Sequence, residues 1–568
     1  MKKQSIKGIA IIAAASFLAT GCDLLKDLDY TVTPDPLEMH GDSVRVKVDI
    51  TFPEKGIKKK AYAEITPMIG ENALKTITVM GEKATANGKV VQYKPGGKVV
   101  YEDVIVYNSS MEKSDLAVTG KVFKGDKEKA QIERTKIADA TTITPMLVTK
   151  DFRVIYANDE FKRVTEEKMY SQVNYLKGKS DVRAGELKRD EVKALEAFLT
   201  DAQSNPKIAI KSINVVGFAS IEGEEDKNNT LSTDRANSAK SATIKIASNK
   251  KVANEKAKDE NSYATSGKGE DFEGFKKALE ASTMESSEKD LILRILSMYS
   301  NPVEREKEIK NLGKTFTFLD NNVFPAQRRS EIHVTYDKTG YTDEELVALS
   351  KSNIDTLNLE EILFTATLTD DLNEKLRLYK EAERMYESDY RPSNNVGAVL
   401  YMQNKLSEAK AQFEKANGIS ENVISKNNLA AIAGVNGDRE TAKSLLAEAK
   451  GAGSEVDYNM GILAIQDGMY DDAISNFGTE STYNKALAQL LNKDHNSAKT
   501  TVDASTDSET AQGYYLKAIC GARADNVDEM VSNLKNAFGK DASLKSKATE
   551  DREFVKYFDN GSFTTVVK

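Results

Sequence analysis

Short alternating runs of apolar and polar residues predict β-strands in the first part of the chain. Val44, Val46 and Val48 are separated by single polar residues, which is the period-2 pattern of a half-buried strand. Turn signals such as residues 86–88 (Ala-Asn-Gly) separate this run from those that follow. The predicted strands are Val44–Phe52, Ala61–Ile65, Lys75–Met80, Lys89–Tyr93, Val99–Val106 and Leu116–Phe123. They predict an antiparallel β-sandwich over residues 41–148, which we interpret as a spacer or docking module, with ligand binding on its loops as the alternative.

Strand and helix patterns alternate in the middle of the chain and predict an α/β sandwich over residues 149–340. The predicted order is strand Gln172–Leu176, helix Glu186–Leu199, strand Lys207–Gly217, helix Ser232–Ile246 and strand Ser330–Tyr336. A charged stretch containing Gly and Ser, residues 249–274, precedes helical runs at Phe275–Glu280 and Lys289–Tyr299. We interpret residues 249–322 as an insertion, a partly flexible loop followed by helices that pack on the domain and form a candidate partner surface.

The last part of the chain, residues 350–568, repeats a pattern of small and large apolar residues with a period of about 34. One frame consists of Gly397, Ala409, Phe413 and Ala416, and it recurs at Ala430, Ala442, Leu446 and Ala449, at Gly461, Ala473 and Phe477, at Ala486, Ala498 and Val502, and at Ala518, Met530, Leu534 and Ala537. This spacing resembles tetratricopeptide repeats. The resemblance implies a solenoid of stacked helix pairs whose concave face binds extended peptides or protein partners, with a generic helical bundle as the alternative.

Asparagines on the first helices of successive repeats are the candidate partner-binding residues. They are Asn395, Asn427, Asn428 and Asn459. An amide side chain offers both a donor and an acceptor, so it can hold the backbone of a bound segment. We therefore predict a partner groove along which Asn395, Asn428 and Asn459 lie.

Three blocks of the central domain resemble the signature of OmpA-like domains. They are residues 217–223 (Gly-Phe-Ala-Ser-Ile-Glu-Gly) followed by Asn228, residues 231–236 (Leu-Ser-Thr-Asp-Arg-Ala) and residues 327–332 (Gln-Arg-Arg-Ser-Glu-Ile). In that family the domain holds the diaminopimelate of peptidoglycan, since a carboxylate pairs with its ammonium group and a guanidinium with its carboxylate. The resemblance therefore implies an OmpA-like fold with a peptidoglycan site.

One position of this site departs from the family pattern. Arg235 matches the family's arginine and Asn228 its asparagine, but Ser220 stands where the family has aspartate. A serine hydroxyl cannot supply a charge-assisted hydrogen bond, which loses more than roughly 1 kcal/mol. Glu222 is the candidate replacement carboxylate. The alternatives are that Glu222 belongs to a solvated acidic loop, that Arg235 is an ordinary surface arginine and that Ser232 only caps the next helix.

The N-terminus has the pattern of a lipoprotein signal peptide. Lysines precede an apolar run, Gly8–Thr20, that is too short to span a bilayer as a mature helix. The run leads into residues 18–22 (Leu-Ala-Thr-Gly-Cys), which resemble the box in which a bacterial lipoprotein is cleaved and its cysteine acylated. We predict a signal peptide over residues 1–21, lipidation of Cys22 and a tether over residues 22–40. An ordinary signal peptide with an incidental cysteine is the alternative.

Composition restricts the chemistry of the chain. Its 568 residues include 88 acidic and 80 basic ones, a net charge of −8, so we expect no nucleic-acid partner. The two cysteines, Cys22 and Cys520, exclude a disulfide framework, and three scattered histidines leave few candidates for a metal site or a catalytic triad. We expect Cys520 to be a buried, unreactive thiol. Acid pairs such as Glu224 and Glu225 lack an accompanying nucleophile motif, so we expect no enzyme, no metal and no cofactor.

These patterns together predict a multidomain α+β protein with an N-terminal β-sandwich, a central OmpA-like α/β sandwich and a C-terminal α-helical tetratricopeptide solenoid. The arrangement resembles multi-domain outer-membrane lipoproteins of Bacteroidetes-type bacteria. Our first hypothesis is a non-enzymatic, lipid-anchored scaffold on the periplasmic side of the outer membrane that links the membrane to peptidoglycan and recruits proteins through its repeats. The alternative, favoured by Ser220, is an accessory lipoprotein of an outer-membrane assembly or secretion complex with a degenerate OmpA-like docking domain. A surface-exposed receptor is a third hypothesis, favoured by the acidic residues that follow Cys22.

Overall fold

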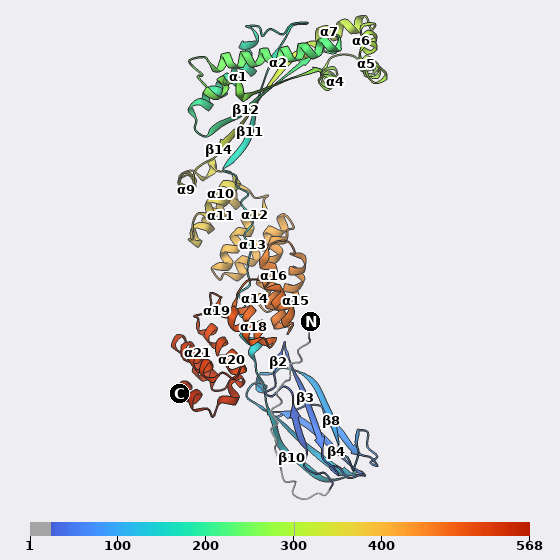
Figure 1. Cartoon of the computed structure of the whole chain (residues 1–568), viewed down its shortest axis with the longest axis vertical. Helices are drawn as coiled ribbons and strands as arrows, with labels where there is room; N and C mark the ends of the chain where they lie inside the picture. The colour runs from blue at the N-terminus through green and yellow to red at the C-terminus, as the bar shows by residue number, and fades with distance from the viewer. Residues whose placement is uncertain (1–23, 300) are drawn as a thin grey trace. The chain divides into compact units, whose positions relative to one another are not determined.

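The computed structural model describes residues 24–299 and 301–568. These residues form two compact units (Figure 1). Unit 1 comprises the described residues up to Asn158 together with Asp371–Lys568, and unit 2 comprises Asp159–Asp370. The chain therefore leaves unit 1 once and returns to it once, so unit 2 is inserted between two parts of unit 1.

The N-terminal part of unit 1 consists of two β-sheets that share one hydrophobic core. In the first sheet, β3 (Ser43–Phe52) pairs with β8 (Gly97–Val106) on one side and with β1 (Asp29–Val32) and β2 (Met39–His40) on the other. The second sheet contains, in order, β10 (Lys127–Asp139), β9 (Asp115–Lys124), β4 (Ala61–Ile69), β6 (Ile77–Gly81) and β7 (Lys89–Val91), with β5 (Asn72–Ala73) on β4. Val44, Val46 and Val48 of β3 are at most 1% exposed, as their alternation predicts.

This β domain begins earlier and contains more strands than the sequence pattern predicts. Asp29 to Val32 pair with β3, and Met39 pairs with Val44. The tether expected over residues 22–40 is therefore too long, because the chain joins a sheet from Asp29 on. The long strand β10 was also not predicted: of its residues only Ala138 is buried, so its charged side chains hide the strand pattern.

The C-terminal part of unit 1 is an array of helices in which consecutive helices from α11 to α22 pack against one another. The helices are α11 (Leu372–Met385), α12 (Tyr390–Met402), α13 (Leu406–Ile419), α14 (Val423–Val435), α15 (Arg439–Glu448), α16 (Ser454–Gln466), α17 (Tyr470–Asn476), α18 (Tyr483–Leu491), α19 (His495–Asp503), α20 (Ala511–Arg523), α21 (Val527–Lys540), α22 (Leu544–Ala548), η6 (Arg552–Tyr557) and α23 (Gly561–Val567). The C-terminal helical region predicted from the sequence is thus confirmed.

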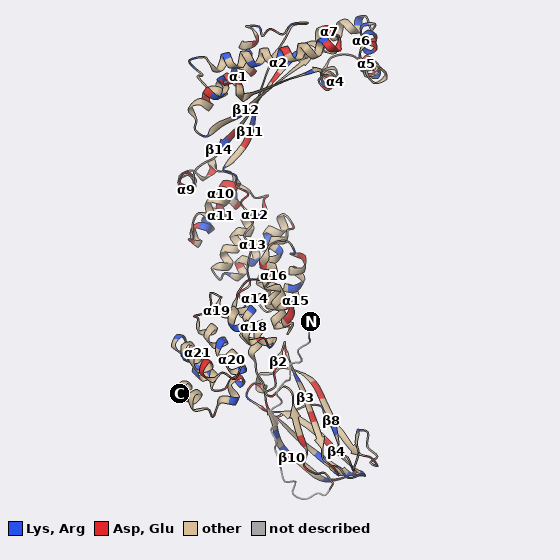
Figure 2. Cartoon of the chain, in the orientation of Figure 1, with Lys and Arg blue, Asp and Glu red and all other residues tan. Residues whose placement is uncertain are grey.

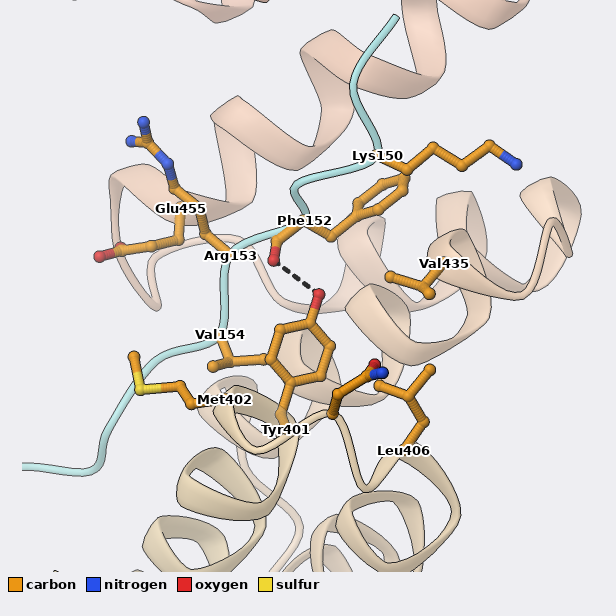
Figure 3. Close-up of a pocket in the computed structure, with 10 residues that line it drawn as sticks. Lys150, Phe152, Arg153, Val154, Tyr401, Met402, Leu406, Val435 and Glu455 are labelled. Atoms are coloured by element: carbon orange, nitrogen blue, oxygen red, sulfur yellow. Dashed lines mark hydrogen bonds between the residues drawn. The ribbon is translucent and has the colours of Figure 1, made fainter. Parts of the chain in front are cut away.

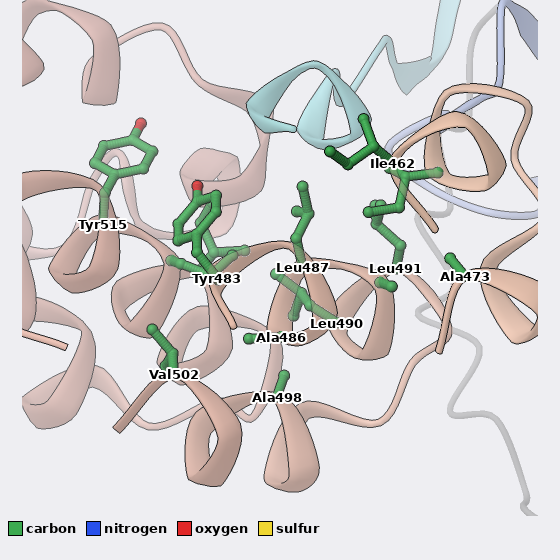
Figure 4. Close-up of a cluster of buried hydrophobic side chains, with 14 of the residues drawn as sticks. Ile462, Ala473, Tyr483, Ala486, Leu487, Leu490, Leu491, Ala498, Val502 and Tyr515 are labelled. Carbon is green, nitrogen blue, oxygen red and sulfur yellow. The ribbon is translucent and has the colours of Figure 1, made fainter. Parts of the chain in front are cut away.

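The repeating small residues of the array lie where consecutive helices cross. A Cβ atom on Gly397 would come within 2.7 Å of the Phe413 ring, and one on Gly461 within 2.7 Å of the Phe477 ring. Figure 4 shows the same arrangement further along, where Ala486 and Ala498 sit among larger buried side chains. The sequence frame is therefore the frame in which the helices pack.

Residues 140–158 lead from the β domain along the helix array. A short helix, η2 (Thr144–Leu147), contacts α16 and α18. Residues 149–157, which we call the strap, follow it without helix or sheet structure and belong to unit 1. The OmpA-like domain was expected over residues 149–340, and this predicted start is too early. Unit 2 begins at Asp159, because the strap hydrogen-bonds to helices of the array rather than to the sheet of unit 2.

The β domain also contacts the array directly. Arg439 of α15 forms an ion pair with Asp42 at 2.8 Å, and Arg552 donates a hydrogen bond to the carbonyl oxygen of Ala140 at 3.2 Å. The β domain, the strap and the helix array therefore belong to the same compact unit.

Unit 2 contains a four-stranded sheet in the order β11-β14-β12-β13. The strands are β11 (Val164–Asn174), β12 (Ile208–Ala219), β13 (Tyr263–Glu270) and β14 (Arg329–Thr339), and only the β12–β13 pair is parallel. The helices α1 (Asp190–Ser204) and α2 (Glu225–Ala247) share one core with one face of this sheet, and η3 (Glu186–Lys188), α3 (Glu255–Lys258) and η4 (Glu260–Ser262) are short connections. This two-layer arrangement is the α/β sandwich that the alternation predicts.

The boundaries of unit 2 differ from the predicted ones at two places. The insertion expected over residues 249–322 begins only after β13, since that Gly-containing segment forms an edge strand of the sheet. Its helices are α4 (Phe272–Ala281), α5 (Ser286–Met298), α6 (Pro302–Lys310), α7 (Lys314–Asn322) and α8 (Phe324–Gln327), and their apolar side chains form a second core that Ile221 joins. The repeats expected from residue 350 also start later, because α9 (Asp343–Ser352), η5 (Ile354–Thr356) and α10 (Leu359–Thr367) belong to unit 2.

Candidate functional site

The predicted lipidation residue, Cys22, lies outside the described residues, so the anchor stays a prediction. In the part of the chain that the structure describes, no helix combines the length and the apolar character needed to cross a bilayer. Basic and acidic residues are interspersed along both units (Figure 2). The distribution of charge therefore does not mark a binding site, and a candidate site has to be identified from the contacts of individual residues.

The OmpA-like signature residues lie where β12 ends and α2 begins. Gly217 allows the helix to pack directly on the strand, since a Cβ atom there would lie 1.9 Å from the carbonyl oxygen of Ser232. Ser232 is buried inside α2, which begins at Glu225, so it is not the N-cap of that helix. Its hydroxyl instead accepts a hydrogen bond from the backbone N–H of Gly269 at 2.9 Å, which joins α2 to the end of β13.

Arg235, the predicted peptidoglycan-binding arginine, is buried inside unit 2 and hydrogen-bonded to the main chain there. It is 1% exposed, so it is not a surface arginine. Its guanidinium donates hydrogen bonds to three main-chain carbonyl oxygens: those of Lys179 at 3.0 Å, Phe218 at 2.8 Å and Leu176 at 3.3 Å. Burial lowers the pKa of Arg235 to about 10. The side chain thus holds together three backbone segments.

Glu222, the predicted replacement carboxylate, pairs with a different arginine. Its Oε1 accepts a hydrogen bond from Arg328 Nη2 at 2.8 Å, and both side chains are at most 8% exposed, so Glu222 does not belong to a solvated loop. Arg328 also pairs with Asp320 at 2.6 Å and donates from Nε to the hydroxyl of Ser220 at 3.4 Å. The other carboxylate oxygen of Glu222, Oε2, is buried without a hydrogen-bond partner among the described residues.

Asn228 connects the signature loop to the end of β13. Its Nδ2 donates to the carbonyl oxygen of Ser220 and to Oε1 of Glu270, both at 3.0 Å. Glu270 is also 3.5 Å from Arg305 of α6. Burial of this carboxyl group raises the pKa of Glu270 to about 7. Asn228 is 6% exposed, so its amide serves this internal network rather than a solvent-facing pocket.

The inserted helices cover the signature loop. Ile221, between Ser220 and Glu222, is 2% exposed and packs in the same core as Phe275 and Phe324 of the insertion. The four predicted site residues, Ser220, Glu222, Asn228 and Arg235, are each less than 8% exposed. The loop is therefore clamped between the sheet and the insertion.

A second predicted site, the asparagine groove of the array, contains the strap. Each of four buried asparagines accepts a hydrogen bond from a strap N–H and donates one to the carbonyl oxygen of the same strap residue. The pairs are Asn395 with Ala157, Asn428 with Ile155, Asn459 with Arg153 and Asn484 with Thr149, at 2.7–3.0 Å. The order of the pairs shows that the strap runs in the opposite direction to the array.

A second row of polar side chains supports these asparagines. Asn394 and Asn427 donate to the carbonyl oxygens of Ile155 and Arg153, both at 3.1 Å. Asn428 also donates to Asn394 at 3.0 Å, and Asn459 to Asn427 at 3.1 Å. Because the amides of Asn394, Asn427, Asn428 and Asn459 hold one another in place, this part of the groove is preorganised to bind an extended backbone.

Two strap side chains are anchored in specific places. Phe152 is 2% exposed and lies against Gly434 of α14, where a Cβ atom would come 2.4 Å from the ring. Arg153 forms two hydrogen bonds with Glu480, at 2.7 and 2.8 Å, and its guanidinium lies 3.5 Å from the centre of the Tyr458 ring. The array therefore binds the strap backbone, and it also offers one site for an aromatic ring and one site for a guanidinium group.

The strap does not fill the groove. A hollow of about 550 Å³ remains beside it, lined by Tyr401, Met402, Leu406 and Val435 of the array and by residues of the strap (Figure 3). Tyr401 donates a hydrogen bond from its hydroxyl to the carbonyl oxygen of Phe152 at 2.8 Å, drawn as the dashed line in Figure 3. Met402 is 55% exposed, so the apolar wall of the hollow is accessible to solvent.

Comparisons with known proteins add little to this description. No family model matches the sequence, and no curated protein matches it significantly. Solved structures that match include YrrB, a TPR protein with an unusual peptide-binding site (19% identity, TM-score 0.21, 36% of this chain and 100% of that one). A tetratricopeptide repeat protein from Parabacteroides merdae (14%, 0.28, 44% and 97%) and yeast Tom70 (14%, 0.25, 64% and 69%) also match. At such identities and TM-scores these likenesses carry no functional argument.

Sequence reasoning missed several residues of the groove. Asn484 stands two places before Ala486, as Asn395 stands two places before Gly397, so the repeat frame contained the signal for it. Tyr401 and Tyr458 carry no such signal, since their roles depend on where the strap lies. That the groove holds a segment of the same chain was not predicted either.

Proposed function

We propose that this chain is a non-enzymatic, lipid-anchored scaffold of the bacterial envelope. More specifically, we infer an accessory lipoprotein of an outer-membrane assembly or secretion complex, anchored through Cys22 on the periplasmic side of the outer membrane. Unit 2 would serve as an OmpA-like docking body that does not bind peptidoglycan, and the helix array would recruit proteins.

The observation that carries this proposal is the internal pairing of the signature residues. A pocket for diaminopimelate needs a guanidinium and a carboxylate that are free to meet the ligand. Arg235 instead donates to three carbonyl oxygens, and Glu222 is paired with Arg328. Ligand binding would have to break these buried hydrogen bonds, each of which costs about 1–3 kcal/mol when its partner is left unsatisfied.

One observation favours the linkage of outer membrane and peptidoglycan as a second candidate. Oε2 of Glu222 is buried without a hydrogen-bond partner among the described residues. A carboxylate oxygen in that state is available to an ammonium group, such as that of diaminopimelate, if the inserted helices move away from the loop.

Sedimentation with insoluble peptidoglycan separates the two candidates. The protein is the purified chain from residue 23 on, and the variants are Glu222→Gln, Ser220→Asp and, as a matched control in the same loop, Glu224→Gln, whose side chain is 65% exposed. We expect the wild-type chain to stay in the supernatant. The Ser220→Asp variant should stay there as well, since a new carboxylate would face Arg328, which already pairs with two.

The opposite result would establish the second candidate. If the wild-type chain pellets with peptidoglycan, and Glu222→Gln abolishes the pelleting while Glu224→Gln does not, then the carboxylate of Glu222 is a ligand-binding group. In that case unit 2 is a wall anchor, and the docking-body proposal is wrong.

A further inference from the structure

The strap is bound to the array in the way that a peptide ligand is bound. Of the nine residues 149–157, only Phe152 and Ala157 are buried, and the other side chains are half-buried or exposed. The strap backbone, in contrast, is paired with asparagine amides at four residues. A segment of the protein core shows the reverse, since its side chains are buried and its backbone pairs within helices or sheets.

The contacts that hold the strap can be reproduced by another segment. Asparagine amides bind N–H and C=O groups, which every residue other than proline provides, so the eight hydrogen bonds at the four strap residues do not depend on the strap sequence. Selectivity comes from the pocket at Gly434, which holds the ring of Phe152, and from Glu480 with Tyr458, which hold the Arg153 guanidinium. A competing segment therefore needs an aromatic residue followed directly by arginine.

The hollow beside the strap gives a competing segment a place to begin. It is open to solvent and lined by apolar side chains of the array, including Met402, Leu406 and Val435, next to Phe152 and Val154 of the strap. An incoming segment can contact this wall before any bond of the strap is broken. It can then replace the backbone bonds one residue at a time, which avoids a state in which all asparagine amides are unpaired.

We propose that the strap is an internal ligand that occupies the peptide-binding face of the array, and that an extended partner peptide with an aromatic-arginine pair displaces it. The partner binds in the same sense as the strap, opposite to the direction of the array. This deepens the proposed scaffold function, on which it rests for the existence of such a partner. Because the test uses the groove and not unit 2, its failure is distinguishable from that of the peptidoglycan experiment.

The test uses the chain from residue 23 on and a fluorescently labelled peptide that spans residues 147–159. In the wild-type chain the strap competes at high effective concentration, so the labelled peptide should bind weakly. In the Phe152→Ala/Arg153→Ala chain the strap is weakened, and we expect the peptide to bind at least tenfold more tightly, measured by fluorescence anisotropy. A peptide with the same two substitutions should lose this gain.

Variants of the array assign the binding to the groove. Asn428→Ala, added to the weakened-strap chain, removes two bonds to Ile155 and should reduce peptide affinity at least tenfold. Asn496→Ala is the matched control, because Asn496 is an exposed asparagine on α19 and should have no effect. Absence of peptide binding to a weakened-strap chain that keeps its helical circular dichroism would overturn the proposal.

Hydrogen exchange of the wild-type chain provides a second, independent measurement. If the strap is an exchangeable ligand, the amides of Arg153, Ile155 and Ala157 exchange faster than the buried helical amides of the array, and excess peptide accelerates them. If these amides exchange only together with the core of the array, the strap is a permanent part of the fold and the proposal is wrong.

Discussion

Replacing Gly434 by alanine tests the docking of the strap through a change on the array side. Gly434 is the next-to-last residue of α14, where alanine normally favours a helix by up to about 1 kcal/mol. A Cβ atom at this position, however, would lie 2.4 Å from Cζ of Phe152. The substitution should therefore destabilise the strap although it improves the helix.

The size of the effect follows from the burial of Phe152. Forcing a methyl group into a packed site costs about 1–3 kcal/mol. If the ring leaves the site altogether, the loss is that of burying a phenylalanine, about 1.5–3 kcal/mol. After subtraction of the helix gain, we expect a net loss of roughly 0.5–2 kcal/mol in the local stability of the strap. Since about 1.4 kcal/mol corresponds to a factor of ten, strap amides should exchange about two- to thirtyfold faster.

Hydrogen exchange with mass spectrometry of the peptides that contain residues 149–157 measures this change. Gly418→Ala is the matched control: Gly418 is the next-to-last residue of the preceding helix, α13, and a Cβ atom there would meet nothing within 4 Å. In a Phe152→Ala background, Gly434→Ala should lose its effect, because the atom with which the methyl group collides is gone. The reasoning is refuted if Gly434→Ala leaves exchange in the strap unchanged or slows it.

Three further predictions concern single groups. Because the folded-state pKa of Glu270, about 7, lies above the ordinary 4.5, folding takes up a proton, so the stability of unit 2 should fall as pH rises from about 4.5 past 7. Glu270→Gln should flatten this profile in thermal unfolding scans at pH 5 and pH 8, and an unchanged slope would contradict the assignment. Glu222→Ala should destabilise unit 2 by roughly 1–3 kcal/mol in urea, since the buried Arg328 keeps Asp320 but loses its buried carboxylate partner, whereas the exposed Glu224→Ala should change the stability by less than about 0.5 kcal/mol. Burial raises the pKa of the Cys520 thiol to about 12. In a Cys22→Ser chain this thiol should therefore react with a disulfide reagent only after denaturant is added. Rapid reaction in buffer would show that the thiol is accessible to solvent.

Much of the fold could be predicted because it depends on patterns that are local in sequence. The alternation around Val46 placed β3, and the repeat frame around Gly397 and Ala409 placed the helix crossings of the array. A period of two or of about 34 residues reflects the geometry of a strand or of a stacked helix pair, so the sequence carries it directly. Strands without such a pattern, β10 and β13, were missed because their positions at sheet edges leave most of their side chains exposed.

The candidate sites could be predicted only in part, because residue type does not specify the partner. The signature placed Arg235 and Glu222 near the same loop, but it did not show that Arg235 is occupied by main-chain carbonyl oxygens. The partner of Glu222 is Arg328, which lies 106 residues further along the chain. Whether a carboxylate is free or paired therefore depended on the packing of the insertion.

The asparagine groove shows most clearly which features the sequence predicts and which depend on tertiary structure. The sequence by itself determined the helices, the frame of the repeats and the positions of Asn395, Asn428 and Asn459, since these follow from local periodicity. Only the tertiary structure decided that the backbone in the groove belongs to the same chain, with Ala157 bound to a residue 238 positions away. The physical reason is that these hydrogen bonds engage backbone N–H and C=O groups, which are nearly the same in every residue and leave no pattern in the strap sequence.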